Sequence, residues 1–173
     1  MTSPRMLAGA GSLLLLAAAV AWLAALRVNL SGSMPIGLYR VRSGPPVKGA
    51  MVLACLPADV AVFARSRGYV PNGRCPGSTA PIGKVVLAMA GDSVEVTAEG
   101  LLLNGRPVRN TRPLAVDAAG RSLRRFPDGT YTVAQDEVWL YSPYSTRSFD
   151  SRYFGPLHVS SIRSRVLPLW TVE

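Results

Sequence analysis

Histidine, cysteine and lysine are scarce in this chain of 173 residues, which contains one, two and two of them respectively. A structural zinc site takes about four ligands, mostly Cys and His, so this composition argues against one. No other metal site and no cofactor is expected from the sequence.

Acidic residues are also few, with ten Asp and Glu against 19 Lys and Arg, which gives a formal net charge of +9. The arginines are scattered, and neither a long basic block nor a nucleic-acid-reading motif is present, so nucleic acid is not an expected partner. Attraction to the anionic headgroups of a lipid bilayer is a simpler use of this charge.

The two lysines are Lys48 and Lys84, in a chain that otherwise uses arginine. An ammonium can lose its proton near neutral pH, whereas a guanidinium cannot. Lys84 opens the apolar run 84–89, which predicts a buried strand, and burial disfavours the charged form of lysine. A pKa near 10.4 leaves about one lysine in 2,500 neutral at pH 7, while a pKa of about 8 leaves roughly a tenth neutral. Lys84 is therefore a candidate general base, and a surface lysine on a strand is the alternative.

An uncharged apolar span of 20 residues runs from Leu7 to Leu26. As a helix it would be about 30 Å long, the thickness of the hydrocarbon core of a bilayer. We expect residues 1–27 to form a single transmembrane anchor and residues 28–173 to form one exported domain. A cleaved signal peptide, with Ala19–Ala21 as its cleavage site, is the alternative, and it also exports the domain.

Ser33 follows this span closely, in the run Ser31–Pro35. A serine hydroxyl is a weak nucleophile until a neighbouring base removes its proton, and Lys84 could be that base. A Ser-His-Asp triad would need His158 instead, but no local triad signature surrounds that residue. We expect His158 to be a surface or edge residue, and a Ser33–Lys84 pair to lie at a membrane surface.

Cys55 and Cys75 could form a disulfide if the domain lies in an oxidising compartment. The bridge would close a loop of about 20 residues and stabilise the domain by roughly 3 kcal/mol. Two free thiols are the alternative.

Short strands and turns dominate the exported part, which predicts a mainly β, antiparallel domain. Residues 58–67 are predicted to form a short helix, because apolar residues recur at helical spacing between Pro57 and Gly68. Residues 69–81 are rich in Gly, Pro and Ser, which predicts a surface excursion. The predicted strands are residues 52–56, 84–89, 93–97, 131–133 and 138–141, with a hairpin over 101–108 that turns at Asn104-Gly105.

Three motifs in order resemble those of the S26 signal peptidase family. They are Ser33-Met34-Pro35 after a membrane segment, the Lys84 strand ending in Gly91-Asp92, and the box Ser148–Gly155 that contains Ser-Phe-Asp-Ser-Arg. The opening run 31–39, the segment 55–77 with both cysteines, and the ending Pro168-Leu169-Trp170 resemble the TraF-type conjugative transfer group of this family. The chain departs from general signal peptidases in having Pro35 directly after Met34 and Val85 directly after Lys84.

The resemblance implies a signal-peptidase-like antiparallel β domain and a Ser/Lys serine endopeptidase. Ser33 and Lys84 would be catalytic, and the Ser31 hydroxyl with the Ser33 backbone N–H would form an oxyanion hole. Ser148 would orient the Lys84 amine. Asp150 would pair with Arg152 and support the site, with Asp150 also implicated in activity.

The same resemblance implies an enzyme of the inner membrane with its catalytic domain in the periplasm. Its expected substrate is an exported pilin-like precursor, and its expected further partners are type IV secretion or mating-pair components. Cyclisation of the pilin is a further implied step. The alternatives are a general signal peptidase with many substrates, a non-catalytic anchored assembly module and a self-cleaving repressor. The apolar span and the lack of a DNA-reading helix pair argue against the repressor.

Overall fold

The computed structural model describes residues 19–20, 22–23 and 25–172. The expected transmembrane span, Leu7 to Leu26, lies mostly outside these residues. Among the described residues, no helix has the length and apolar character needed to cross a membrane. Leu26, predicted to end the span, instead begins a strand, because residues 26–29 pair with residues 37–40.

The described domain is mainly β, as the sequence predicts. In chain order its elements are β1 (Leu26–Asn29), β2 (Ile36–Arg42), β3 (Met51–Ala54), α2 (Ala58–Ser66), β4 (Asn72–Cys75), η1 (Pro76–Ser78), β5 (Ile82–Met89), β6 (Ser93–Thr97), β7 (Gly100–Leu103), β8 (Arg106–Pro107), β9 (Gly129–Thr132), β10 (Glu137–Tyr141), α3 (Ser151–Phe154), β11 (Leu157–His158), η2 (Val159–Ser161) and β12 (Ile162–Val172).

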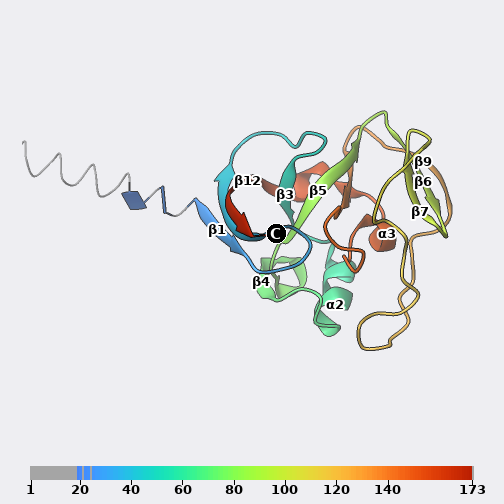
Figure 1. The fold of residues 1–173 in the computed structure, drawn as a ribbon, viewed down its shortest axis with the longest axis horizontal. Coiled ribbons are helices and arrows are strands. Elements are labelled where there is room, and N and C mark those ends of the chain that lie inside the picture. Colours follow the sequence, from blue (N-terminus) through green and yellow to red (C-terminus); the bar gives the residue numbers. More distant parts are fainter. Residues whose placement is uncertain (1–18, 21, 24, 173) are drawn as a thin grey trace, which may run out of the picture.

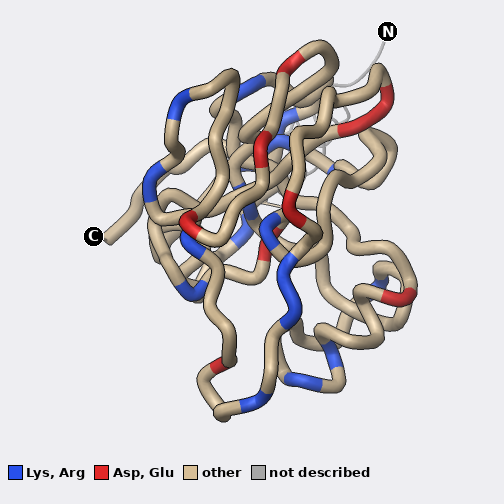
Figure 2. The backbone as a smooth tube through the Cα atoms, turned by 90° about the vertical axis from the view of Figure 1, so that its right-hand side faces the viewer, with Lys and Arg blue, Asp and Glu red and all other residues tan. Residues whose placement is uncertain are grey.

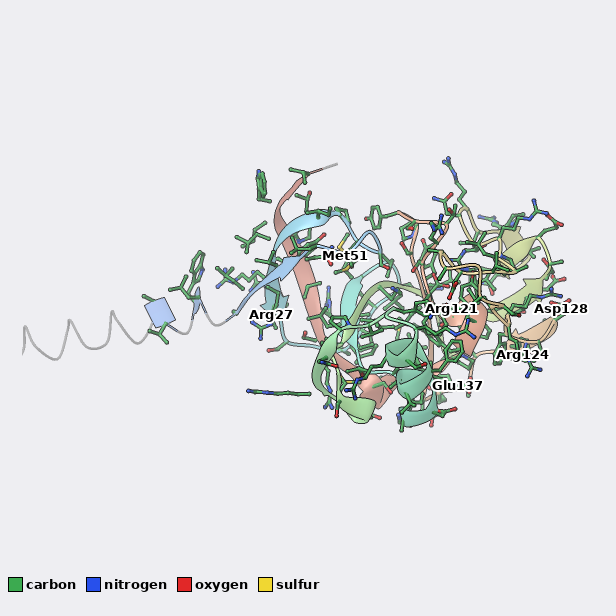
Figure 3. All side chains as sticks on the ribbon, turned by 90° about the horizontal axis from the view of Figure 1, so that it is seen from below. Arg27, Met51, Arg121, Arg124, Asp128 and Glu137 are labelled. Atoms are coloured by element: carbon green, nitrogen blue, oxygen red, sulfur yellow. A yellow bond between two sulfur atoms is a disulfide. The ribbon has the colours of Figure 1, made fainter. Side chains whose placement is uncertain are left out.

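Two antiparallel sheets organise these strands. The larger sheet has the order β1-β2-β12-β3-β5-β10-β11, and the smaller has the order β8-β7-β6-β9. Figure 1 shows the small sheet at the end of the molecule opposite to β1. In Figure 3, Arg27 marks the β1 end, and Arg124 and Asp128 mark the other end. In the larger sheet, β5 has β3 on one side and β10 on the other.

Apolar side chains on both faces of β5 build the core. Val86 packs with Val52 of β3, Leu140 of β10 and the buried alanines of α2. Leu87 and Ala88 pack instead against the small sheet, together with the fully buried Trp139. A third cluster joins Met34, Tyr39 and Val166 beneath the turn between β1 and β2. The strand that carries Lys84 is therefore fixed from both faces.

A disulfide joins Cys55, just after β3, to Cys75 at the end of β4. The bridged loop contains α2, whose Ala61 and Ala64 are buried. The segment 69–81, predicted to be a surface excursion, is largely exposed, but it buries Val70, Cys75 and Thr79 and contains β4 and η1. The sulfur bridge and packing against α2 account for this burial.

Most elements predicted from the sequence are confirmed. The helix over 58–67 is α2, with Arg67 as its C-cap residue, and the strand over 93–97 is β6. The hairpin over 101–108 is β7 and β8, with Asn104 and Gly105 at positive φ in its turn. β2 and the eleven-residue β12 were not predicted from the sequence. In β12 the pairing register with β2 shifts between Pro168 and Trp170, so the strand has an irregularity where proline interrupts its pattern.

Candidate active site

Ser33 lies in the turn that connects β1 to β2, and one side chain organises this turn. Asn29, the last residue of β1, donates from Nδ2 to the carbonyl oxygens of Ser31, Met34 and Pro35 at 2.9–3.0 Å. Its Oδ1 accepts from the backbone N–H and the hydroxyl of Ser31. Because these five contacts span the turn, the backbone around Ser33 is held by hydrogen bonds from a single amide. Asn29 was not predicted from the sequence to belong to the site.

Lys84 is placed inside the protein by β5. Val52 of β3 lies directly opposite Lys84, and Tyr141 of β10 lies opposite the next residue, Val85. Lys84 is 4 % exposed. Burial lowers the pKa of Lys84 from 10.5 to about 8, with Asp150 opposing this effect and Arg152 adding to it. A lysine with this pKa is neutral in about a tenth of molecules at pH 7.

Ser148 is brought to Ser33 from the distant box, with 3.3 Å between the two hydroxyl oxygens. Ser33, Lys84 and Ser148 all line one cavity of about 250 Å³. A second cavity, of about 510 Å³, also contains Ser33 and Lys84 but extends toward Ser31, Met34 and β1. The candidate nucleophile and base therefore lie where two parts of a cleft meet.

Asp150 and Arg152 form a buried ion pair behind these residues. Arg152 donates from Nε to Asp150 Oδ1 at 2.8 Å and from Nη2 to Oδ2 at 3.0 Å. The same guanidinium donates to the carbonyl oxygens of Asn110, Arg112, Thr146 and Ser148. Arg152 thereby fixes the backbone of the loop that carries Ser148.

Ser142 is a second residue that the sequence analysis missed. It is fully buried, and its hydroxyl donates to the carbonyl oxygen of Ser33 at 2.9 Å. The Ser142 hydroxyl oxygen itself accepts from the N–H groups of Tyr144 and Ser145, and the Ser142 N–H donates to Asp150. No motif marks this position, because its role follows from where β10 ends and not from the local sequence.

Ser31, expected to contribute a hydroxyl to the oxyanion hole, donates that hydroxyl to Asn29 Oδ1 at 2.8 Å. A hydrogen bond from Ser31 to a developing oxyanion would therefore require its hydroxyl to leave Asn29.

Close packing brings the turn and β5 together. A Cβ atom at Gly83 would lie 2.4 Å from Cε of Met34, so a larger residue at this position would displace the end of the Met34 side chain from β5. Met34 follows Ser33 and Gly83 precedes Lys84, so this contact sets the spacing between the two segments. A serine followed by methionine, and a lysine preceded by glycine, are thus parts of one packing arrangement.

Within the described strands, the first residues of β5 have a partner on one side only. Residues 82–85 pair with β3, whereas the pairing with β10 starts at Val85. Residues 82–84, which line the larger cavity, therefore have no ladder partner on the β10 side among the described strands. Backbone groups without a ladder partner can hydrogen-bond an added extended peptide.

His158 lies on the surface with partners of its own. Its Nε2 is 2.9 Å from Asp136 Oδ2, and its Nδ1 is 2.6 Å from Ser160 Oγ. The side chain also accepts from the Ser160 backbone N–H, which makes it a cap of a short 3₁₀ turn. Neither cavity around Ser33 has His158 among its described lining residues.

Basic residues are spread over the described chain and do not gather on one face in the view of Figure 2. Several arginines have acidic partners, including Arg121 with Asp117, Arg125 with Asp128 and Arg152 with Asp150.

Comparison with known proteins identifies the family. The family model described as "Signal peptidase, peptidase S26" matches residues 5–170. The chain belongs to the S26 signal peptidase family. The resemblance inferred from the three motifs is thus confirmed across nearly the whole sequence.

Curated relatives show which members of the family the chain is similar to. "Plasmid transfer protein TraF" from Escherichia coli is 42% identical over 165 residues, covering 94% of this chain and 92% of the relative. "Conjugal transfer protein TraF" from Agrobacterium fabrum is 36% identical over 173 residues, covering 98% and 96%. A crystal structure of a signal peptidase I from Enterococcus faecalis aligns with a TM-score of 0.42 and 18% identity, over 73% of this chain and all of that one.

Proposed function

We propose that this S26 family member is a membrane-anchored serine endopeptidase with Ser33 as nucleophile and Lys84 as general base. The observation that carries the proposal is the buried Lys84, whose pKa is lowered to about 8, in the cavity that also contains Ser33 and Ser148. A general base works best when its pKa is close to the operating pH. A surface lysine with an ordinary pKa of about 10.4 would be almost fully protonated at neutral pH and could not accept the Ser33 proton.

The reaction follows from these groups. Lys84 takes the proton of Ser33 while Ser33 Oγ attacks the scissile carbonyl carbon, and the resulting tetrahedral intermediate expels the amine, which receives the proton from Lys84. Water then attacks the acyl-enzyme with Lys84 again as base, which releases the acid and restores Ser33. The Ser33 backbone N–H and the Ser31 hydroxyl are the proposed oxyanion donors, and one such donor contributes about 3 kcal/mol to the transition state.

An extended peptide is the proposed form of the substrate. The unpaired edge of residues 82–84 supports this proposal, because an added strand can hydrogen-bond there and carry its scissile bond past Lys84. The larger cavity, lined by Met34, Tyr39, Leu53 and Val166, would take the side chains of that strand. Small residues near the cut are the expected preference.

A lipid bilayer is the proposed partner of the β1 end of the domain. Leu30 and Trp170 are 79% and 64% exposed there, and further exposed apolar residues on β1, β2 and β12 are Val28, Ile36, Leu167, Leu169 and Val172. Exposed apolar groups on neighbouring strands are typical of an interaction surface. We propose that this surface faces the inner membrane next to an anchor within residues 1–27, with the catalytic domain in the periplasm.

The proposed substrate is a pilin-like precursor of a conjugative transfer apparatus, whose other components would be further partners. The names of the relatives, at 36–42% identity over most of the chain, support this choice. Maturation of the pilin beyond cleavage, such as cyclisation, belongs to the same proposal. A general signal peptidase and a non-catalytic assembly module are the competing functions.

The test uses two precursors, each co-expressed with the full chain. One is the pilin-like precursor encoded with the transfer genes, and the other is an unrelated secretory precursor, with mass spectrometry of the products as readout. Cleavage of the pilin-like precursor alone is the expected result. Equal cleavage of both would favour a general signal peptidase, and cleavage of neither would overturn the proposed activity.

A further inference from the structure

Ser33 belongs to no helix or strand, so its position depends on contacts made by the turn itself. Besides the hydrogen bonds of Tyr39 to the Pro35 carbonyl and of Ser33 to Ser148, three sets of contacts hold that turn in the described structure. Met34 packs over Gly83, Asn29 hydrogen-bonds the turn from the β1 side, and Ser142 hydrogen-bonds the Ser33 carbonyl from the β10 side.

The Asn29 contacts tie the start of the turn to its end. A side-chain amide has two N–H donors and one carbonyl oxygen, so donation to three carbonyls means that at least one N–H is shared. The oxygen accepts twice from Ser31, and the nitrogen reaches Met34 and Pro35 beyond Ser33. Loss of this amide would leave the backbone on both sides of Ser33 without these hydrogen bonds.

The Ser142 contact ties the turn to the strand next to Lys84. Ser142 directly follows Tyr141, which pairs with Val85, and Val85 directly follows Lys84. The Ser142 N–H is itself anchored on Asp150, which belongs to the buried ion pair with Arg152. A short covalent and hydrogen-bonded path therefore connects the carbonyl of Ser33 to the strand that carries the lysine.

We infer that Asn29 and Ser142 are positioning residues that hold the hydroxyl of Ser33 in reach of Lys84. The inference rests on the proposed function, because it concerns the nucleophile of that reaction. Neither residue touches the scissile bond in this account, so each acts only through the placement of Ser33. A misplacement of about 1 Å can lower a rate about 100-fold, so two hydrogen bonds from outside the motifs can decide the activity.

The test uses the reactivity of a thiol at the position of Ser33, which does not depend on any substrate. Cys55 and Cys75 are bridged and are the chain's two cysteines, so a Ser33→Cys variant carries one free thiol. Its alkylation rate by iodoacetamide is measured from pH 6 to 9 on the full chain in detergent. Second variants add Lys84→Met, Asn29→Ala, Asn29→Asp or Ser142→Ala.

A nearby ammonium favours the thiolate, so Lys84→Met is expected to slow alkylation at pH 7 about 10-fold, through a thiol pKa shift of about one unit. Asn29→Ala and Ser142→Ala are expected to lose most of the same acceleration and to raise the pH midpoint. Asn29→Asp keeps the oxygen that holds Ser31 but loses the donors, so it separates the two halves of the Asn29 contact.

Matched controls are Asn104→Ala and Thr97→Ala. Asn104 also makes hydrogen bonds through both ends of its amide, to the Ser93 N–H and to Asp92. Thr97, like Ser142, donates its hydroxyl to a backbone carbonyl, that of Gly100, and accepts from a backbone N–H, that of Glu99. Both are expected to leave the alkylation rate unchanged, and thermal unfolding of every variant separates misplacement from misfolding.

The outcomes separate the two claims. Lys84-dependent alkylation that is lost in the Asn29 and Ser142 variants supports both. Lys84-dependent alkylation that persists in both variants overturns the positioning role and leaves the proposed function intact. Alkylation that ignores Lys84→Met would contradict the Ser33–Lys84 pair itself and, with it, the inference. With the pilin-like precursor, the Asn29→Ala and Ser142→Ala variants should lower kcat about 10- to 100-fold and leave KM nearly unchanged.

Discussion

The hydroxyl oxygens of Ser33 and Ser148 lie 3.3 Å apart, although 115 residues separate them in the chain. Arg152 holds Ser148 in place, because its guanidinium donates a hydrogen bond to the Ser148 carbonyl oxygen and also pairs with Asp150. The box at 148–155 therefore supports the candidate site from behind, while the turn at 31–35 and β5 supply the two reacting groups. Each motif therefore has its own role, either support of the site or supply of a reacting group, and each role can be tested separately.

The rate of cleavage should rise with pH through the pKa of Lys84. Burial lowers that pKa to about 8, and only the neutral amine can take the Ser33 proton. We expect kcat/KM for the pilin-like precursor to increase about tenfold per pH unit below pH 7 and to level off above pH 9. A profile that is flat between pH 6 and 9 in a protein that remains folded would contradict Lys84 as the base.

Asp150→Asn should move this profile to lower pH. The negative charge of Asp150 raises the pKa of Lys84 against the effect of burial, so its removal lets the pKa fall below 8. The variant should therefore reach half its maximal rate at a lower pH than wild type, whatever its maximal rate is. A midpoint that stays in place or rises would show that Asp150 does not act on Lys84 through its charge. The exposed Asp128→Asn is the matched control.

Lys84→Met should stabilise the folded protein near neutral pH. The pKa of Lys84 is lowered on folding, so between about pH 8 and 10.5 the unfolded chain binds a proton that the folded chain does not. In wild type, the free energy of unfolding therefore increases as pH rises through this window. Below pH 8 the folded protein bears the full energetic cost of burying the Lys84 ammonium. Methionine should remove up to about 3 kcal/mol of this cost at pH 7.

The measurement is chemical denaturation of both proteins at pH 7 and at pH 10.5. The stability difference should be largest at pH 7 and should shrink toward pH 10.5. Equal stability of the two proteins at pH 7 would mean that the ammonium of Lys84 is solvated in the folded state.

Removal of the disulfide should lower stability without changing the chemistry. A bridge over about 20 residues contributes roughly 3 kcal/mol, so the double variant Cys55→Ala, Cys75→Ala should unfold at a lower temperature. The loop includes Tyr69 and Val70, which line both cavities, so substrate affinity should weaken while the pH midpoint stays at that of Lys84. Dithiothreitol should reproduce the effect in wild type and have none on the double variant. A double variant as stable as wild type would show that the bridge contributes nothing.

The sequence predicts strands with a regular apolar pattern better than strands that are defined by their pairing. Residues 93–97 alternate between buried and half-buried positions, so β6 is evident from a period of two. The long β12 has charged and exposed residues within it and a proline near its end, and its identity as a strand comes from pairing with β2 and β3. Pairing between distant segments leaves little trace in a local pattern.

The candidate site shows the same division. Lys84 is recognisable because lysine is scarce in this chain and the residue opens an apolar strand. Ser33 is recognisable because it stands in the Ser-Met-Pro motif shortly after the apolar span. Asn29 and Ser142 are common polar residues whose contacts exist only after β1 and β10 have taken their places. The hydrogen bond of Ser31 to Asn29 likewise depends on the folded turn, so sequence alone could not show which partner its hydroxyl has.

The most direct test of the Ser33–Lys84 mechanism compares processing of the co-expressed pilin-like precursor by wild type, Ser33→Ala and Lys84→Met, read by intact mass. His158→Ala serves as the control, because His158 pairs with Asp136 and Ser160 on the surface. We expect cleavage by wild type and by His158→Ala, and loss of cleavage in the other two variants while both remain folded. Unchanged processing by Ser33→Ala or by Lys84→Met would contradict the mechanism.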